Sequence, residues 1–144
     1  MYKGTIYNGK TGMIISTCRA SSEADIVLQT TLNPDHKAYI GDELDAMLYY
    51  FENDAPASRL RMKLKINGQD HVYTDFGEEP EHQFKVGDIL RIDGIPKGTE
   101  LWYIDGTIIV DDGFIEWTTD TPGVFQFNLS LFPYATTRIY AEFI

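Results

Sequence analysis

The sequence is poor in cysteine, in long apolar runs and in basic residues, and each shortage excludes a class of protein. A single cysteine, Cys18, cannot form an internal disulfide, so we expect folding in a reducing compartment. The longest apolar runs, such as residues 107–110 and 46–51, are far shorter than the roughly 20 residues of a membrane-spanning helix. The first residues also lack the apolar core of a signal peptide. We therefore predict a soluble protein without a membrane partner.

Basic residues are both scarce and unevenly distributed. Lysine and arginine number 12 against 22 acidic residues, for a formal net charge of -10. Phosphate binding needs a basic surface, so nucleic acid is not an expected partner. Residues 1–66 hold eight acids and eight bases, whereas residues 67–144 hold 14 acids and four bases. Such asymmetry is typical either of a directional interface or of a solvated acidic surface.

Residues that could carry catalysis show no recognisable spacing. Cys18 could act as a nucleophile only with a histidine as base, and no local signature surrounds it. The three histidines are too scattered to predict a metal site: they are His36, His71 and His82. No glycine-rich phosphate loop precedes a helix.

Acidic residues in the second part of the chain also fall short of a site. Asp111-Asp112-Gly113 has the appearance of a calcium-loop fragment, but it lacks the alternating oxygen ligands and the distal glutamate. The spacing of Glu116 and Asp120 does not place two carboxylates on opposite sides of a cleft. We therefore predict that the protein is not an enzyme and has no cofactor or metal site.

Strand-like runs dominate residues 91–134. They are rich in β-branched and aromatic residues and are divided at short intervals by turn signals. Asp-Gly pairs supply residues that tolerate positive φ, as a two-residue turn requires. The pattern predicts consecutive antiparallel hairpins, with turns at Asp93-Gly94, Pro96, Asp105-Gly106, Asp112-Gly113 and Pro122-Gly123.

The first part of the chain predicts a hairpin followed by a short helix. Strand-like residues 2–7 and 13–18 flank a five-residue loop. Ser21 or Ser22 can cap a helix that continues to Gln29, with acids in its first turn. An edge strand at 38–40 and an aromatic strand at 46–51 follow. Residues 53–58, which include Pro56, are predicted to be a flexible join.

Residues 59–66 alternate strictly between cations and aliphatics. A period of two places the aliphatic residues in a core and the cations on one solvent face. Asn67-Gly68 then predicts a turn, and residues 71–74 can return as a partner strand. The aliphatic residues are Leu60, Met62, Leu64 and Ile66, and the cations are Arg59, Arg61, Lys63 and Lys65.

Together these patterns predict a mainly β fold with two parts. Residues 1–55 form a small subdomain of a β-hairpin and a short helix, and residues 58–144 form an antiparallel immunoglobulin-like β-sandwich. Trp117 and Phe125 flank Pro122-Gly123 in opposite arms of a hairpin, and we expect both to be largely buried.

Two surfaces could bind a partner. Four like charges on one face repel each other unless an acidic group offsets them. The charge can be offset by solvent, by an acidic loop of the same chain at residues 75–81, or by a neighbouring subunit. The predicted interface therefore comprises Arg59, Arg61, Lys63 and Lys65, with Tyr49 and Tyr50 contributing apolar area. Alternatively, Trp102, Tyr103 and Trp117 form a flat platform for sugar rings, unless they belong to the core.

Several turn and core motifs carry a family resemblance. The second part resembles the C-terminal β-sandwich segment of small structural proteins of tailed bacteriophages, and the first part is similar to them as well. The resemblance implies a virion or tail-associated protein without enzymatic activity. The matching motifs of the second part are Gly94-Ile95-Pro96, Gly98-Thr99, Asp105-Gly106, Asp112-Gly113, Glu116-Trp117, Pro122-Gly123 with Phe125, and Phe132-Pro133-Tyr134. Those of the first part are residues 2–7, Thr11-Gly12 with Ile14-Ile15, Gln29, Tyr39-Ile40-Gly41 and Tyr49-Tyr50.

The leading functional hypothesis is a non-enzymatic structural and interaction protein of a phage particle, such as a tail, fibre or head-surface adaptor. It would be made in the bacterial host cytoplasm and located in the virion. Its partners would be other virion proteins and further copies of itself, as a homo-oligomer. The alternatives are a carbohydrate-binding β-sandwich module and a phage accessory protein that inhibits a host factor.

Overall fold

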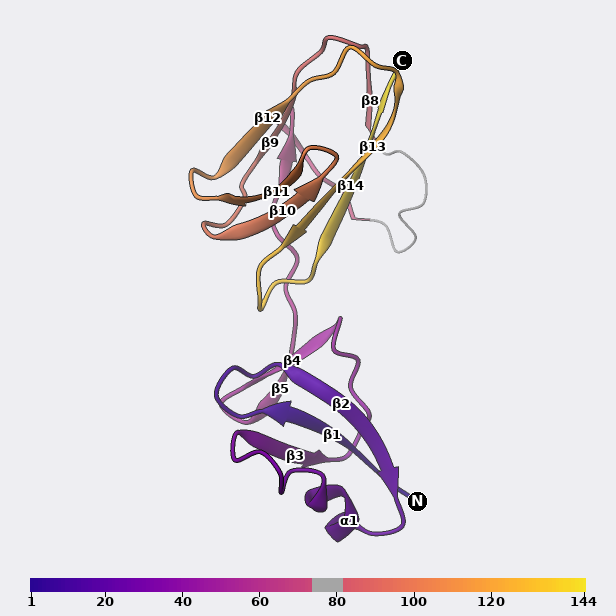
Figure 1. Ribbon diagram of the computed structural model, residues 1–144, viewed down its shortest axis with the longest axis vertical. Helices are drawn as coiled ribbons and strands as arrows, with labels where there is room; N and C mark the ends of the chain where they lie inside the picture. Colours follow the sequence, from indigo (N-terminus) through magenta and orange to yellow (C-terminus); the bar gives the residue numbers. More distant parts are fainter. Residues whose placement is uncertain (74–81) are drawn as a thin grey trace. The chain divides into compact units, whose positions relative to one another are not determined.

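The computed structural model describes residues 1–73 and 82–144. Within them the protein is mainly β, with 49% strand and 4% helix in antiparallel sheets, which confirms the predicted class. The chain divides into two compact units, Met1–Arg59 (unit 1) and Leu60–Ile144 (unit 2) (Figure 1). The predicted acidic loop at 75–81 lies outside the described residues.

Unit 1 contains a three-stranded antiparallel sheet. The central strand is β1 (Tyr2–Asn8), which lies between β2 (Ile14–Ala20) and β3 (His36–Ile40). The predicted β1–β2 hairpin and the predicted edge strand are confirmed. Both follow from strand-forming runs separated by turn residues.

A short helix covers one face of this sheet. Helix α1 (Glu23–Leu28) begins after Ser22, whose Oγ accepts a hydrogen bond of 3.2 Å from the backbone N–H of Asp25. The cap predicted at Ser22 is therefore confirmed. Ile26 of the helix is fully buried and lies against Gly4 of β1, where a Cβ atom would stand 2.8 Å from Ile26 Cγ2. The absence of a side chain at residue 4 thus allows the helix to approach the sheet.

Residues 53–58 are not a flexible join, because they complete a second hairpin in unit 1. Strands β4 (Tyr49–Glu52) and β5 (Ala55–Ser58) pair across Asn53 and Asp54, whose φ angles are 52° and 61°. Asparagine and aspartate tolerate these angles, so a polar pair that suggests a linker forms a tight turn. The predicted strand at 46–51 begins only at Tyr49, because residues 46–48 form a turn.

Tyr7 connects the sheet of unit 1 to this hairpin. Its ring stacks on Phe51 with centroids 3.8 Å apart, and its hydroxyl donates a hydrogen bond of 3.1 Å to Asp54. Burial and the nearby Asp54 carboxylate raise the pKa of Tyr7 from 10.0 to about 12. Hydrogen bonds from Lys37, at 3.0 Å, and from Tyr7 lower the pKa of Asp54.

The raised pKa of Tyr7 predicts alkaline destabilisation of unit 1. The unfolded chain loses this proton near pH 10, whereas the folded unit retains it up to about pH 12. The contribution is therefore complete below pH 10 and is lost as the pH rises toward about 12. Denaturant unfolding followed by circular dichroism, with the stability plotted against pH from below 10 to about 12, checks this. Tyr7→Phe should reduce the loss of stability between pH 10 and about 12. An identical dependence of stability on pH in both proteins would contradict the prediction.

Unit 2 is built from two sheets that share one core. The five-stranded sheet has the order β11 (Gly106–Val110), β10 (Thr99–Tyr103), β13 (Gly123–Ser130), β14 (Thr137–Phe143) and β8 (His82–Phe84). The four-stranded sheet has the order β12 (Phe114–Trp117), β9 (Leu90–Asp93), β6 (Lys65–Ile66) and β7 (Gln69–Asp70). The β14–β8 pairing is parallel and the other pairings are antiparallel. Buried residues of both sheets form the core, among them Ile66, Leu90, Ile92, Leu101, Phe127, Leu129, Ile139 and Phe143.

Of the consecutive hairpins predicted in residues 91–134, the structure forms only one, and the others are wrong. β10 and β11 pair across a turn at Ile104 and Asp105. In contrast, β9 and β12 belong to the other sheet, so residues 94–98, 111–113 and 118–122 connect one sheet to the other. Turn residues show where the chain reverses direction, but they do not show whether it stays in the same sheet.

The alternation in residues 59–66 correctly predicts most of the buried side chains, but most of the segment is not a strand. Met62, Leu64 and Ile66 are buried as expected, whereas Leu60 is 72% exposed. In this segment only Lys65–Ile66 forms a strand, and its hairpin partner is Gln69–Asp70. The sequence predicts the partner at residues 71–74, of which residue 74 lies outside the described chain. Residues 59–64 form no strand.

Trp117 and Phe125 also differ from the prediction. They lie in different sheets rather than in the two arms of one hairpin, with ring centroids 4.8 Å apart. Both are half-buried instead of largely buried, and both pack against the core of unit 2. The residues around Pro122-Gly123 therefore carry the chain between the sheets.

Candidate functional site

The six residues of the predicted interface are divided between the two units. Tyr49, Tyr50 and Arg59 belong to unit 1, and the other three cations belong to unit 2. Both tyrosines are half-buried on β4, and Arg59 Nε donates a hydrogen bond of 3.4 Å to the backbone oxygen of Tyr49. The unit 2 members, here called the cationic strip, are Arg61, Lys63 and Lys65.

The cationic strip lines a groove of about 480 Å³ on unit 2. All three side chains are exposed, and the Arg61 guanidinium lies 4.9 Å from the centre of the Tyr73 ring. Lys65 stands opposite Asp93 of β9 and Asp70 of β7. Within residues 1–73 and 82–144, Arg61 and Lys63 have no ion-pair partner. The strip is therefore a positive surface on an otherwise acidic unit.

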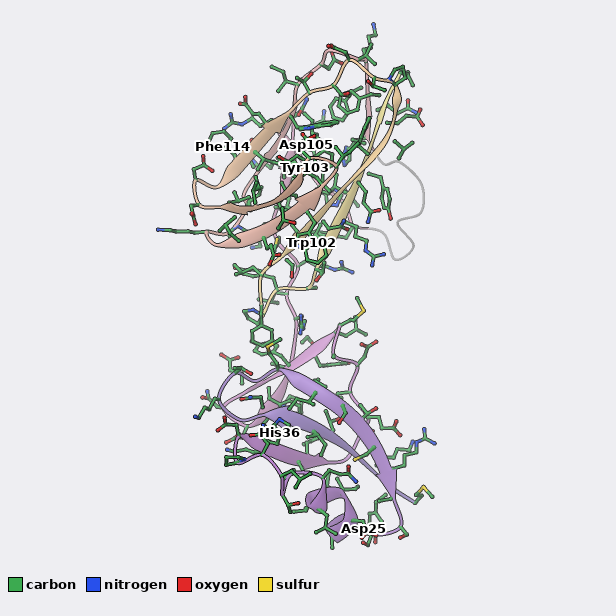
Figure 2. The ribbon with its side chains drawn as sticks, viewed as in Figure 1. Asp25, His36, Trp102, Tyr103, Asp105 and Phe114 are labelled. Carbon is green, nitrogen blue, oxygen red and sulfur yellow. The ribbon has the colours of Figure 1, made fainter. Side chains whose placement is uncertain are left out.

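The three aromatic residues considered as a sugar platform do not lie together on one surface. Tyr103 stacks on Phe127 with centroids 5.9 Å apart, and Trp117 packs edge-on against the same ring. Only Trp102 is exposed, at 57%, on the outer face of the five-stranded sheet (Figure 2). Its indole N–H donates to Glu100. A shallow groove of about 370 Å³, here called the Trp102 groove, is lined by Trp102, Gln126, Asn128, Ser130, Thr136 and Arg138.

The clearest unsatisfied surface is the edge strand β11, which the sequence analysis did not identify. β11 ends the five-stranded sheet, and its outer side has no partner strand among the described residues. Its five residues include no charge and no proline, and Ile108 and Ile109 are 42% and 57% exposed. Unpaired backbone N–H and C=O groups on such a strand can pair with another chain.

An open groove, lined mainly by apolar side chains, adjoins this edge. It measures about 320 Å³ and lies between β11 and β12, the end strands of the two sheets, so we call it the edge groove. The Trp117 indole N–H donates a hydrogen bond of 2.8 Å to Asp105, which fixes that carboxylate after β10. Acidic residues on the lining are Asp112 and Glu116, and apolar ones include Leu101, Tyr103, Ile108, Val110, Ile115 and Trp117.

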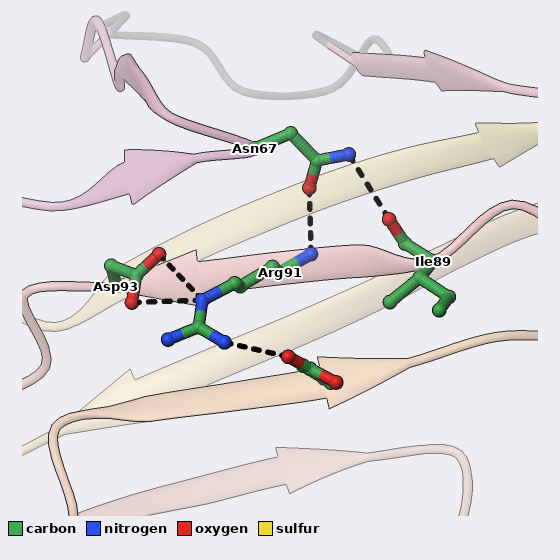
Figure 3. Close-up of polar contacts among 5 residues, drawn as sticks. Asn67, Ile89, Arg91 and Asp93 are labelled. Carbon is green, nitrogen blue, oxygen red and sulfur yellow. Dashed lines mark hydrogen bonds and ion pairs between the residues drawn. The ribbon is translucent and has the colours of Figure 1, made fainter.

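The β12 side of the edge groove is held by a polar network (Figure 3). Arg91 of β9 donates to Glu116 at 2.6 Å and to both carboxylate oxygens of Asp93 at 3.0 Å. Its guanidinium lies 4.1 Å from the centre of the Phe114 ring. The Asn67 side chain accepts a hydrogen bond from the backbone N–H of Arg91 through Oδ1 and donates one to the backbone oxygen of Ile89 through Nδ2. Within the described residues Glu116 therefore has a cationic partner, unlike the acids that flank β11.

The possible catalytic residues are not brought into a nucleophile–base arrangement. Cys18 of β2 stands opposite Gly4, and His36 of β3 stands opposite Asn8, so they lie on different sides and at different ends of β1. His71 and His82 belong to unit 2, with Nδ1 and Nε2 3.2 Å apart. In the described chain, histidine, cysteine and acidic side chains do not gather in groups of three that could hold a metal. No helix in those same residues is long and apolar enough to cross a membrane.

Comparison of the chain with known protein families, curated proteins and solved structures finds no match.

Proposed function

We propose that the protein is a non-enzymatic structural and interaction protein of a tailed bacteriophage particle, such as an adaptor at the tail, fibre or head surface. The observation that carries the proposal is the uncharged edge strand β11, whose outer side has no partner strand among the described residues, beside an open groove lined mainly by apolar side chains. Such an edge is a surface for binding another chain. The phage setting rests on the resemblance of the turn and core motifs. The proposal is tested by looking for the protein in purified phage particles, where we expect to detect it.

An immunoglobulin-like topology of unit 2 is part of this proposal. β9 pairs with β12 in one sheet, while β10, β11, β13 and β14 share the other. This order fits strands B and E opposite strands C, C′, F and G of an immunoglobulin-like sandwich. Among the described residues no strand takes the place of strand D beside E, which is where the edge groove opens. Unlike an antibody domain, this sandwich has an exposed tryptophan on the C-like strand and no disulfide.

Self-assembly through the cationic strip belongs to the same proposal. The strip of one copy can contact the acidic surface of the next, and a heterologous contact of this kind closes into a ring when the rotation permits. Exposed ion pairs contribute only about 0 to 1 kcal/mol each and are screened by salt, so charge would orient a contact that apolar area stabilises.

Charge reversal tests the self-assembly. We expect the wild-type mass measured by light scattering to exceed that of a monomer at low salt and to fall at high salt. Arg61→Glu combined with Lys63→Glu should be monomeric at both salt concentrations. Lys97→Glu, at an exposed position outside the strip, is the matched control and should behave like the wild type. A wild-type monomer at high concentration and low salt would leave only assembly with other virion proteins.

A second candidate function, carbohydrate binding, is favoured by the Trp102 groove. An exposed indole can stack on the apolar face of a sugar ring, and the amide and hydroxyl side chains around it can bind sugar hydroxyls. A glycan array probed with the wild type and with Trp102→Ala tests this. Binding that is lost in Trp102→Ala but kept in Ile104→Ala, at a residue 66% exposed, would support it. Absence of binding to every glycan would remove this candidate.

A further inference from the structure

We propose that β11 and the edge groove form a docking site for an extended segment of another protein, which adds a strand to the five-stranded sheet and carries lysine or arginine at its ends. The inference rests on the proposed function, because it names how this interaction protein would hold a partner.

Among the four sheet edges that the described residues of unit 2 form, β11 alone lacks the features that block pairing. Edge strands are usually protected by shortness, charge or proline. β7 has two residues and β8 has three, with Lys85 directly after it. β12 carries Glu116, which is held by Arg91. β11 is the longest of the four, and none of these features protects it.

The groove beside β11 provides space for the side chains of an added strand. Alternate side chains of a strand point to the same face, so every second residue of the partner would point toward the edge groove. There it would cover Ile108, which is 42% exposed, and the neighbouring apolar lining. Backbone pairing gives affinity in this mode of binding, and the pockets for alternate side chains give specificity.

Charge at the ends of β11 identifies the kind of partner. Asp105 precedes the strand, Asp111 and Asp112 follow it, and none of the three has a cationic partner within the described residues. If two copies paired antiparallel through β11, Asp105 of one copy would approach Asp111 of the other. Like charges placed opposite each other disfavour that pairing. The same carboxylates favour a segment with cationic ends.

Synthetic peptides test the docking site directly. The probe has a core of about six alternating valine and threonine residues, a common strand length, with two lysines at each end, and its matched control has glutamates there. By NMR, the lysine peptide should shift the signals of residues 106–110 and slow their amide exchange. The glutamate peptide should bind at least about tenfold more weakly, equal to about 1.4 kcal/mol.

Two variants with the same substitution complete the test. Ile109→Lys places a charge on the open edge and should abolish binding of the lysine peptide. Val124→Lys changes a residue of similar exposure, 54%, on the paired strand β13 and should leave binding unchanged. Three results would overturn the inference: no binding of the lysine peptide, equal binding of both peptides, or a dimer of the protein alone that Ile109→Lys dissociates. The last would make a second copy the occupant.

Incorporation into particles separates this inference from the proposed function. If the protein is present in purified particles and Ile109→Lys is incorporated at the wild-type level, the docking inference fails and the proposed function stands. If the wild type is absent from particles, the proposed function fails, whatever the peptides show.

Discussion

Replacement of Trp117 by alanine should lower the free energy of unfolding of unit 2 by about 3 kcal/mol or more. The indole contacts the rings of Phe125, Phe127 and Phe143, with centroids 4.8, 5.4 and 5.5 Å away. It therefore joins β12 of one sheet to strands of the other. A loss of this size is a large share of the roughly 5 to 15 kcal/mol that stabilises a domain, so we expect little soluble protein.

Trp102→Ala is the matched control for Trp117→Ala. Trp102 is 57% exposed on the outer face, so its removal should change the stability of unit 2 only slightly. Both tryptophans belong to unit 2, so tryptophan fluorescence during denaturation follows that unit alone. Equal stabilities of Trp117→Ala and the wild type would contradict the proposed position of Trp117 between the sheets.

Replacement of Gly12 by alanine should destabilise unit 1 by about 2 kcal/mol or more. Gly12 has a φ of 80°, and a Cβ atom there would stand 2.0 Å from the backbone oxygen of Phe51. The Gly12 carbonyl also accepts a hydrogen bond of 2.8 Å from the Phe51 N–H. An added methyl group must therefore displace the β4–β5 hairpin from the β1–β2 loop.

Gly9→Ala provides the control within the same loop. The atoms nearest to a Cβ at residue 9 belong to the flexible Lys37 side chain, which can move away. Hydrogen exchange should show faster exchange in residues 1–59 for Gly12→Ala, with residues 60–144 unchanged. Destabilisation of both units together, or of neither, would contradict this prediction.

Local features of the structure could be predicted from the sequence. Ser22 lies before two acids and begins α1, since a cap depends on residues within one turn of the helix. The β1–β2 hairpin follows from its loop composition for the same reason. The period of two correctly predicted the burial of Met62, Leu64 and Ile66. In each case the determining contacts are close in sequence or are set by side-chain alternation.

Features that depend on distant contacts could not be predicted. The same turn signals occur at Asp105, within a sheet, and at Asp112, between sheets, because the destination of the next strand depends on the core it joins. Asn53 and Asp54 suggested a linker because turns and linkers share polar composition. β11 could be recognised as a strand but not as an edge, since edge position is a property of the assembled sheet.

Mass spectrometry of purified phage particles is the most direct measurement of the central proposal. We expect peptides of this protein in the particles at a constant ratio to other structural proteins, and we expect that ratio to fall for Ile109→Lys but not for Val124→Lys. Absence of the wild-type protein from particles produced by cells that contain it in soluble form would contradict a structural and interaction role in the virion.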